Sequence, residues 1–81
     1  MTLERKPLDS GWAWQWHAHP DITHQLQWLA DREQWVQWQR VGDGGWTSQE
    51  VPQLQIPADD ADAHEIAKAY VGSLVRGARG V

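Results

Sequence analysis

Cysteine is missing from the 81 residues of this chain, and so is phenylalanine. Without cysteine, neither a disulfide framework nor a zinc site built on thiolates is possible. A domain of this size is only marginally stable, so packing in its apolar core has to hold it together. Because there is a single tyrosine, nearly all aromatic packing must come from seven tryptophans.

Long apolar runs are also missing. No stretch approaches the roughly 20 apolar residues that span a membrane as a helix. The first ten residues, MTLERKPLDS, lack the apolar centre of a secretion signal. Together with the absence of cysteine, these features favour a cytoplasmic location.

Positive charge is scarce in the middle of the chain. The net charge is −4, and four of the seven basic residues lie near the two ends. Between residues 7 and 75, ten carboxylates face three bases, Arg32, Arg40 and Lys68. Proteins bind nucleic acids through lysine and arginine side chains that neutralise phosphates, so this balance argues against direct nucleic-acid binding. An acidic chain is better suited to a protein partner with a basic surface.

All the tryptophans lie between residues 12 and 46. They are Trp12, Trp14, Trp16, Trp28, Trp35, Trp38 and Trp46. The first three alternate with other residues, which places their indoles on one face of a strand over residues 11–19. A buried indole removes roughly 150–250 Å² from water, and apolar burial is worth about 25 cal/mol per Å². We therefore expect this row to be core that faces a helix.

Residues 22–41 allow two interpretations. As one helix, the segment has Asp21 as a possible N-cap and Gly42 as a possible C-cap. Its apolar side chains would then surround the helix instead of forming one stripe. As a hairpin, two alternating strands are joined by a polar turn at residues 31–33. We favour the hairpin.

The rest of the chain contains one strong turn and one clear helix. Gly-Asp-Gly-Gly at residues 42–45 predicts a hairpin turn into a strand at residues 46–50. Pro52 places that strand at a sheet edge, and residues 53–56 resume the alternation. Beyond Pro57, apolar residues at three-four spacing predict a helix over residues 60–76.

These elements predict an α+β fold. We expect an antiparallel meander of three to four strands with one C-terminal helix packed on one face. Residues 1–10 are expected to be a flexible arm, residues 11–77 a single compact domain and residues 78–81 a frayed end.

Residues that could carry chemistry are few. No serine lies in a glycine-framed nucleophile elbow, and the 42–45 turn lacks the lysine of a phosphate loop. His17, His19 and His24 could hold a zinc ion, but the first two are out of phase with the tryptophan row, as outward-facing polar residues would be. We therefore expect no enzyme, no cofactor and no metal, and keep a metal protein built on these histidines as an alternative.

The remaining features point to binding. Trp35 and Trp38 are three residues apart and cannot both face inward from a regular strand, so one of them is a candidate anchor. Acidic residues near the helix start are candidates for contact with a basic surface. The predicted partner-binding residues are Trp35, Trp38, Asp59, Asp60, Asp62 and Glu65.

These features favour a small acidic protein-binding module. One concrete version is an inhibitor or accessory factor, of a phage or mobile-element type, that occupies a basic site on a nucleic-acid-processing complex. Glutamines on the outer strand faces could instead serve a homodimer. The alternative from another class is a binder of nucleic acid or a small ligand that uses the tryptophan-rich face as a stacking platform.

Overall fold

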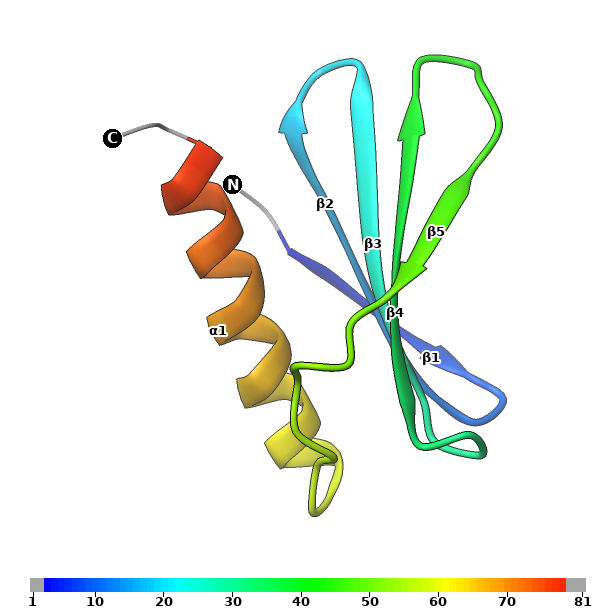
Figure 1. The fold of residues 1–81 in the computed structure, drawn as a ribbon, viewed down its shortest axis with the longest axis vertical. Coiled ribbons are helices and arrows are strands. Elements are labelled where there is room, and N and C mark those ends of the chain that lie inside the picture. The colour runs from blue at the N-terminus through cyan, green and yellow to red at the C-terminus, as the bar shows by residue number, and fades with distance from the viewer. Residues whose placement is uncertain (1–2, 79–81) are drawn as a thin grey trace.

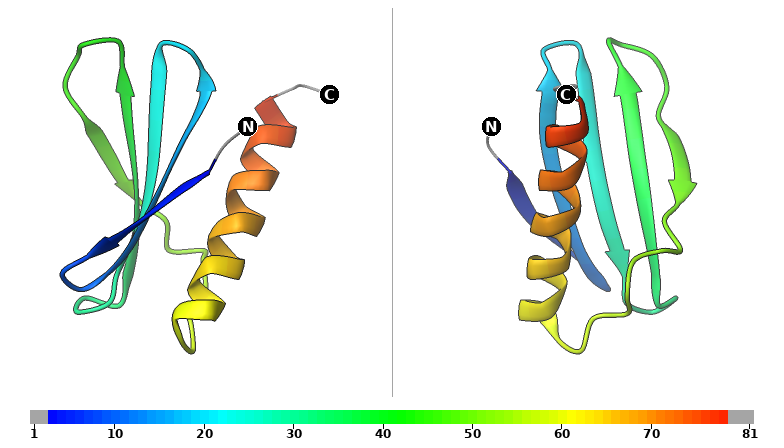
Figure 2. Two further views of the ribbon diagram at one scale, coloured as in Figure 1. Left: turned by 180° about the vertical axis from the view of Figure 1, so that it is seen from behind. Right: turned by 60° about the vertical axis from the view of Figure 1, so that its left-hand side comes forward.

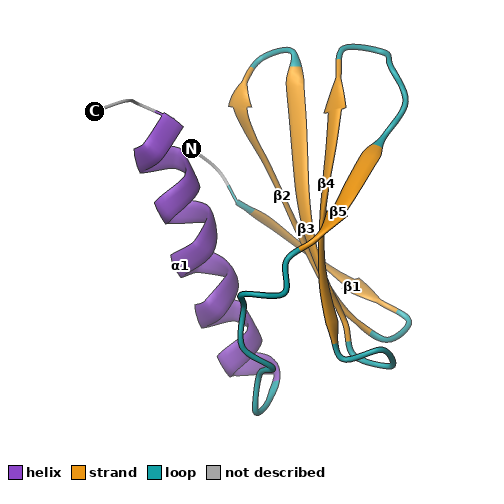
Figure 3. Cartoon of the chain, in the orientation of Figure 1, coloured by secondary structure: helices purple, strands orange, loops and turns teal. Residues whose placement is uncertain are grey.

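In the computed structural model, which describes residues 3–78, five strands form one antiparallel sheet and a helix crosses one of its faces (Figure 1, Figure 3). The strands pair in chain order. They are β1 (Glu4–Leu8), β2 (Gly11–His19), β3 (Ile22–Leu29), β4 (Gln34–Val41) and β5 (Thr47–Glu50), followed by helix α1 (Asp60–Ala78). The α+β meander with one C-terminal helix is confirmed, although the sheet has five strands instead of three to four.

The additional strand comes from the segment predicted to be a flexible arm. Residues of β1 pair with β2 from Glu4 opposite Gln15 to Leu8 opposite Gly11. Proline and charged residues are what protect the edge of a sheet, because proline offers no N–H to a neighbouring strand. The same composition is typical of a loose arm, which is why the strand is missed. Residues 1–2 lie outside the described part of the chain.

The hairpin interpretation of residues 22–41 is confirmed. Strands β3 and β4 are paired along their whole length, from Ile22 opposite Val41 to Leu29 opposite Gln34. The predicted polar turn joins them, and Glu33 takes a left-handed conformation there, with φ of 49°. The even spacing of Ile22, Leu26 and Trp28 along β3 outweighs the possible helix caps at Asp21 and Gly42.

The predicted strand at residues 53–56 is wrong. After β5, the Val51 N–H donates to the Trp35 carbonyl at 3.0 Å, and the chain then turns back on itself. Leu54 packs against the core, and the Gln55 carbonyl accepts a hydrogen bond from Trp35 Nε1 at 2.8 Å. Because Pro52 stops the ladder, the segment becomes a connection that leads to the helix.

Helix α1 begins where the acidic residues predict. The Asp59 carbonyl accepts the first helical hydrogen bond, from Ala63 N–H at 3.0 Å. The Asp59 side chain accepts from Asp62 N–H at 2.8 Å, and Asp62 in turn accepts from Ala58 N–H at 2.9 Å. This reciprocal capping satisfies amides that the helix leaves free. Of residues 78–81, predicted to fray, Ala78 ends the helix and the others lie outside the described residues.

The core lies between α1 and the face of the sheet that it covers (Figure 2). The tryptophan row is confirmed as part of this core, with Trp14 2% and Trp16 1% exposed. Small residues of the helix face the indoles, and Ala63 and Ala67 are both fully buried. Their size lets the helix backbone approach the aromatic layer closely.

Candidate functional site

The opposite face of the sheet is not covered by the helix, and we call it the open face. The alternation of side chains along each strand assigns residues to it. Two cross-strand rows form its centre. The first row is Glu4, Gln15, Gln25, Trp38 and Ser48, and the second is Lys6, Ala13, Gln27, Val36 and Glu50.

Hydrogen bonds between side chains connect the middle of the open face. Trp38 Nε1 donates to Gln27 Oε1 at 3.1 Å, and Gln27 Nε2 donates to Gln25 Oε1 at 2.6 Å. Gln25 Nε2 donates to Gln15 Oε1 at 3.5 Å. We call these four residues the amide array. It runs across β2, β3 and β4 and holds long side chains in one arrangement, so less conformational entropy is lost when a partner docks.

A hollow of about 420 Å³ adjoins the amide array between β4 and β5. Val36 and Trp38 form part of its wall, with Ser48 and Glu50 on the side of β5. Tryptophan is enriched among the residues that dominate the binding energy of interfaces, and Trp38 stands beside a depression that a partner side chain can enter.

Charge is confined to the margins of the two rows. Glu4 and Lys6 stand on β1, at one edge of the sheet, and Glu50 stands on β5, at the other. The three strands between them contribute only uncharged side chains to these rows. An uncharged centre with a charged rim is the usual composition of a protein interface.

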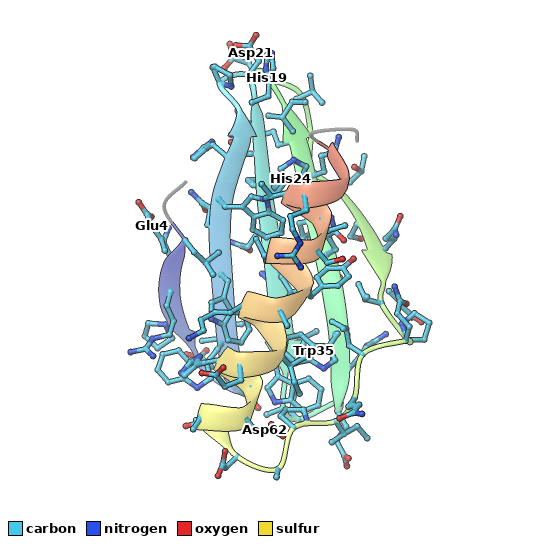
Figure 4. All side chains as sticks on the ribbon, turned by 90° about the vertical axis from the view of Figure 1, so that its left-hand side faces the viewer. Glu4, His19, Asp21, His24, Trp35 and Asp62 are labelled. Atoms are coloured by element: carbon cyan, nitrogen blue, oxygen red, sulfur yellow. The ribbon has the colours of Figure 1, made fainter. Side chains whose placement is uncertain are left out.

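The structure separates the two predicted tryptophan anchors. Trp35 is 3% exposed and stacks on Trp14, with ring centroids 5.6 Å apart. Figure 4 shows it beneath the helix. It is therefore a core residue and not an exposed anchor, because its position in the strand is in phase with Trp28 across the ladder. Trp38 is half-buried on the open face.

The tryptophans proposed as a stacking platform lie on the covered side. Trp14, Trp16 and Trp28 are buried beneath α1, and Trp12 is partly buried beside them. Their π-faces are occupied by one another and by the helix, so this row offers no surface on which a base or a sugar could stack.

The predicted acidic residues lie together at the start of α1. Asp59 and Asp62 are the capping residues described above, and Glu65 Oε1 lies 3.2 Å from Lys68 Nζ. Asp60 is exposed. Two of the four carboxylates are thus bonded to the backbone of the helix start, where Figure 4 shows Asp62.

The structure separates His19 from His24, two of the three histidines of the predicted metal site. A register shift between Trp16 and His19 breaks the alternation of β2. His19 lies at the hairpin tip, where its Nδ1 accepts from Asp21 N–H at 3.1 Å (Figure 4). His24 stacks on Trp16 under the helix, with centroids 5.2 Å apart. Within residues 3–78, no group of three histidine or carboxylate side chains is placed to hold a metal ion.

Burial affects two histidines on the covered face. Desolvation, followed by the charge of His17, lowers the pKa of His24. Desolvation also lowers the pKa of His64, whose ring meets Trp12 edge-on at 4.8 Å. Arg5 contributes to the lowered pKa of His64 and lies over the Trp12 ring at 5.1 Å. Both imidazoles therefore favour the neutral form.

A second hollow of about 610 Å³ lies between β1 and the first half of α1. Arg5, His64 and Lys68 line it together with Glu65. Sequence reasoning misses this hollow, because it depends on β1 joining the sheet. Glu65 already pairs with Lys68, so the hollow presents no uniform charge to a ligand.

The outer-face assignment of the glutamines is right for some and wrong for others. Gln25 and Gln27 are on the open face, whereas Gln37 lies on the covered face and accepts a hydrogen bond from Tyr70 Oη at 2.6 Å. Gln39 is in phase with Gln37. The amide array could be anticipated in part from the Trp/Gln alternation, but its bonds depend on the register between three strands.

Helix α1 is the single helix of the described residues, and it is not apolar enough to cross a membrane. Comparison with family models, curated proteins and solved structures finds no match to this chain. Its function has to be argued from its own surfaces.

Proposed function

We propose that this protein is a non-enzymatic protein-binding module that docks its partner on the open face of the sheet. The observation that carries the proposal is the amide array, in which Gln15, Gln25, Gln27 and Trp38 are hydrogen-bonded across three strands without cover from the helix. Trp38 is the expected anchor, and the hollow beside it is expected to receive a side chain of the partner.

The chemistry of the open face suits a protein better than a nucleic acid. A phosphate backbone requires lysine and arginine along its path. The two central rows carry Lys6 alone as a base, and Arg40 in the row of Thr23 and Arg32 beside the hollow share the face with Glu4 and Glu50. Amide groups both donate and accept hydrogen bonds, so they can satisfy the backbone or polar side chains of a docked protein.

The narrower hypothesis of an acidic inhibitor or accessory factor concerns a separate surface. It places a basic site of the partner against Asp59, Asp60, Asp62 and Glu65 at the start of α1. The helix that carries this surface lies on the covered side of the sheet (Figure 2), so one molecule could use both surfaces. The test has to keep the helix caps, and asparagine does so because it caps as well as aspartate. Replacing Asp59, Asp60 and Asp62 together with asparagine should lower the affinity for such a partner at least tenfold without unfolding the helix.

Site-directed photo-crosslinking in the native host tests the main proposal. A photoreactive residue at Gln15, on the open face, is compared with the same residue at Ala69, which is exposed on α1. After nuclease treatment, we expect a protein adduct from position 15 that is reduced several-fold by Trp38→Ala. The proposal fails if both positions give equal yields, or if the position-15 adduct disappears with nuclease.

A further inference from the structure

We propose that the partner of the open face is a second copy of this chain, related by a two-fold axis that runs along β3. This inference rests on the proposed function of the open face and names its occupant. It starts from the sheet order, in which β3 is the middle of five strands and has two neighbours on each side.

The axis lies in the interface between the two copies, above β3 and parallel to it. A rotation of 180° about this axis exchanges the two edges of the sheet. It places β1 of one copy over β5 of the other, and β2 over β4, while each cross-strand row stays opposite itself. The register therefore predicts the contacts directly. In the second row, Lys6 meets Glu50 of the second copy and Ala13 meets its Val36; in the first row, Gln15 meets Trp38 of the second copy.

The residues on the axis satisfy the condition that such symmetry imposes. A residue on a two-fold axis meets its own copy, so a charged side chain there would be repelled. The open-face residues of β3 are Thr23, Gln25, Gln27 and Leu29, and none is charged. Thr23, Gln25 and Gln27 each carry a donor and an acceptor, and can therefore hydrogen-bond to themselves, while Leu29 meets an apolar equivalent.

The off-axis contacts at the two edges of the sheet are complementary in charge. Ala13 is only 2% exposed, so its neighbours on the sheet already cover it, and Val36 of the second copy would rest on those neighbours. Lys6 and Glu50 are both exposed and carry opposite charges at opposite edges of the sheet. Aligned sheets keep their strand directions within about 30° of each other, and flexible lysine and glutamate side chains can span the shift that a small rotation causes at the edges.

The size of the face predicts a weak dimer. Five strands at about 4.8 Å spacing and about 24 Å in length give a flat area of roughly 500–600 Å² per copy. Stable interfaces begin at about 600 Å² per partner. Side-chain relief increases the area in contact, so we expect dissociation in the micromolar range. The acidic helix starts of both copies would remain on the outside of this dimer.

Variants that exchange the charges of Lys6 and Glu50 test the inference. Analytical ultracentrifugation over about 1 µM to 1 mM protein measures the dissociation constant of the dimer. Lys6→Glu and Glu50→Lys each replace two attractive rim pairs with repulsive ones, so each should raise the dissociation constant about tenfold. The double variant Lys6→Glu/Glu50→Lys should return it to within about threefold of the wild-type value. Lys68→Glu, on the exposed side of α1, is the control and should leave it unchanged.

Three results would overturn the inference: a monomer at every concentration, a dimer that neither single variant weakens, or a double variant that does not recover. Circular dichroism confirms that the variants are folded. The proposed function is tested separately, because an adduct between position 15 and a different protein supports docking on the open face even when the chain is monomeric. If no protein adduct forms and the chain is monomeric, both proposals fail.

Discussion

The two faces of the sheet are made by the same strands, but they are ordered by different interactions. On the covered face, alternate residues are indoles that pack on one another and on the helix, and water is excluded from Trp14, Trp16 and Trp35. On the open face, the residues between them are glutamines and a tryptophan joined by hydrogen bonds. Because side chains alternate between the two faces of a strand, the same strands contribute to the core on one face and to the proposed binding surface on the other.

Trp35→Ala and Trp38→Ala should show the largest contrast between the faces. Removing the buried Trp35 leaves a cavity and loses its hydrogen bond to the Gln55 carbonyl, so we expect a loss of about 3–5 kcal/mol in the free energy of unfolding. Removing the half-buried Trp38 should cost about 1 kcal/mol, near the centre of the range for single substitutions. Urea denaturation followed by circular dichroism measures both. Equal losses would mean that the open face is also part of the core.

The sequence predicts the features that depend on neighbouring residues better than those that depend on pairing between distant strands. The alternation of Trp12, Trp14 and Trp16 is local and predicts both the strand and its buried side. Trp35 and Trp38 have an odd spacing, so the sequence separates them without saying which of them faces the helix. That choice follows from the register of β4 on β3, which pairs Trp35 with Trp28.

The binding surface is less predictable than the core for the same reason. Burial leaves an apolar pattern in each strand, whereas the amide array needs three strands in register before any of its bonds exists. The strand β1 is missed because its proline and charges suit an unpaired arm as well as a protected edge. Of the candidate anchors, Trp38 therefore keeps its predicted role as a proposal, and Trp35 moves to the core.

Asp59→Ala should destabilise helix α1, which covers one face of the sheet, without changing the open face. It removes the side-chain acceptor for Asp62 N–H, and loss of such a cap costs about 1 kcal/mol. Asp59→Asn removes the same charge and keeps the acceptor, so it should cost no more than a few tenths of a kcal/mol. Crosslinking from Gln15 should be the same in both variants. Equal losses with asparagine and with alanine would show that charge, and not capping, stabilises the helix start.

Acidification should lower the stability of the folded protein through the covered face, by less than the loss of the Asp59 cap does. The effect is small because the rings of His24 and His64 are only partly buried. Their pKa values are lowered in the folded protein, so the unfolded chain takes up protons first. Stability is therefore complete above the unfolded pKa of about 6.5 and falls as the pH drops from there toward the folded values. Thermal melts between pH 7.5 and 5.5 should show this loss, and His24→Gln should reduce it. His19→Gln, at the hairpin tip, is the matched control. If the melting temperature is independent of pH across this window, the neutral histidines contribute nothing to the contrast between the two faces.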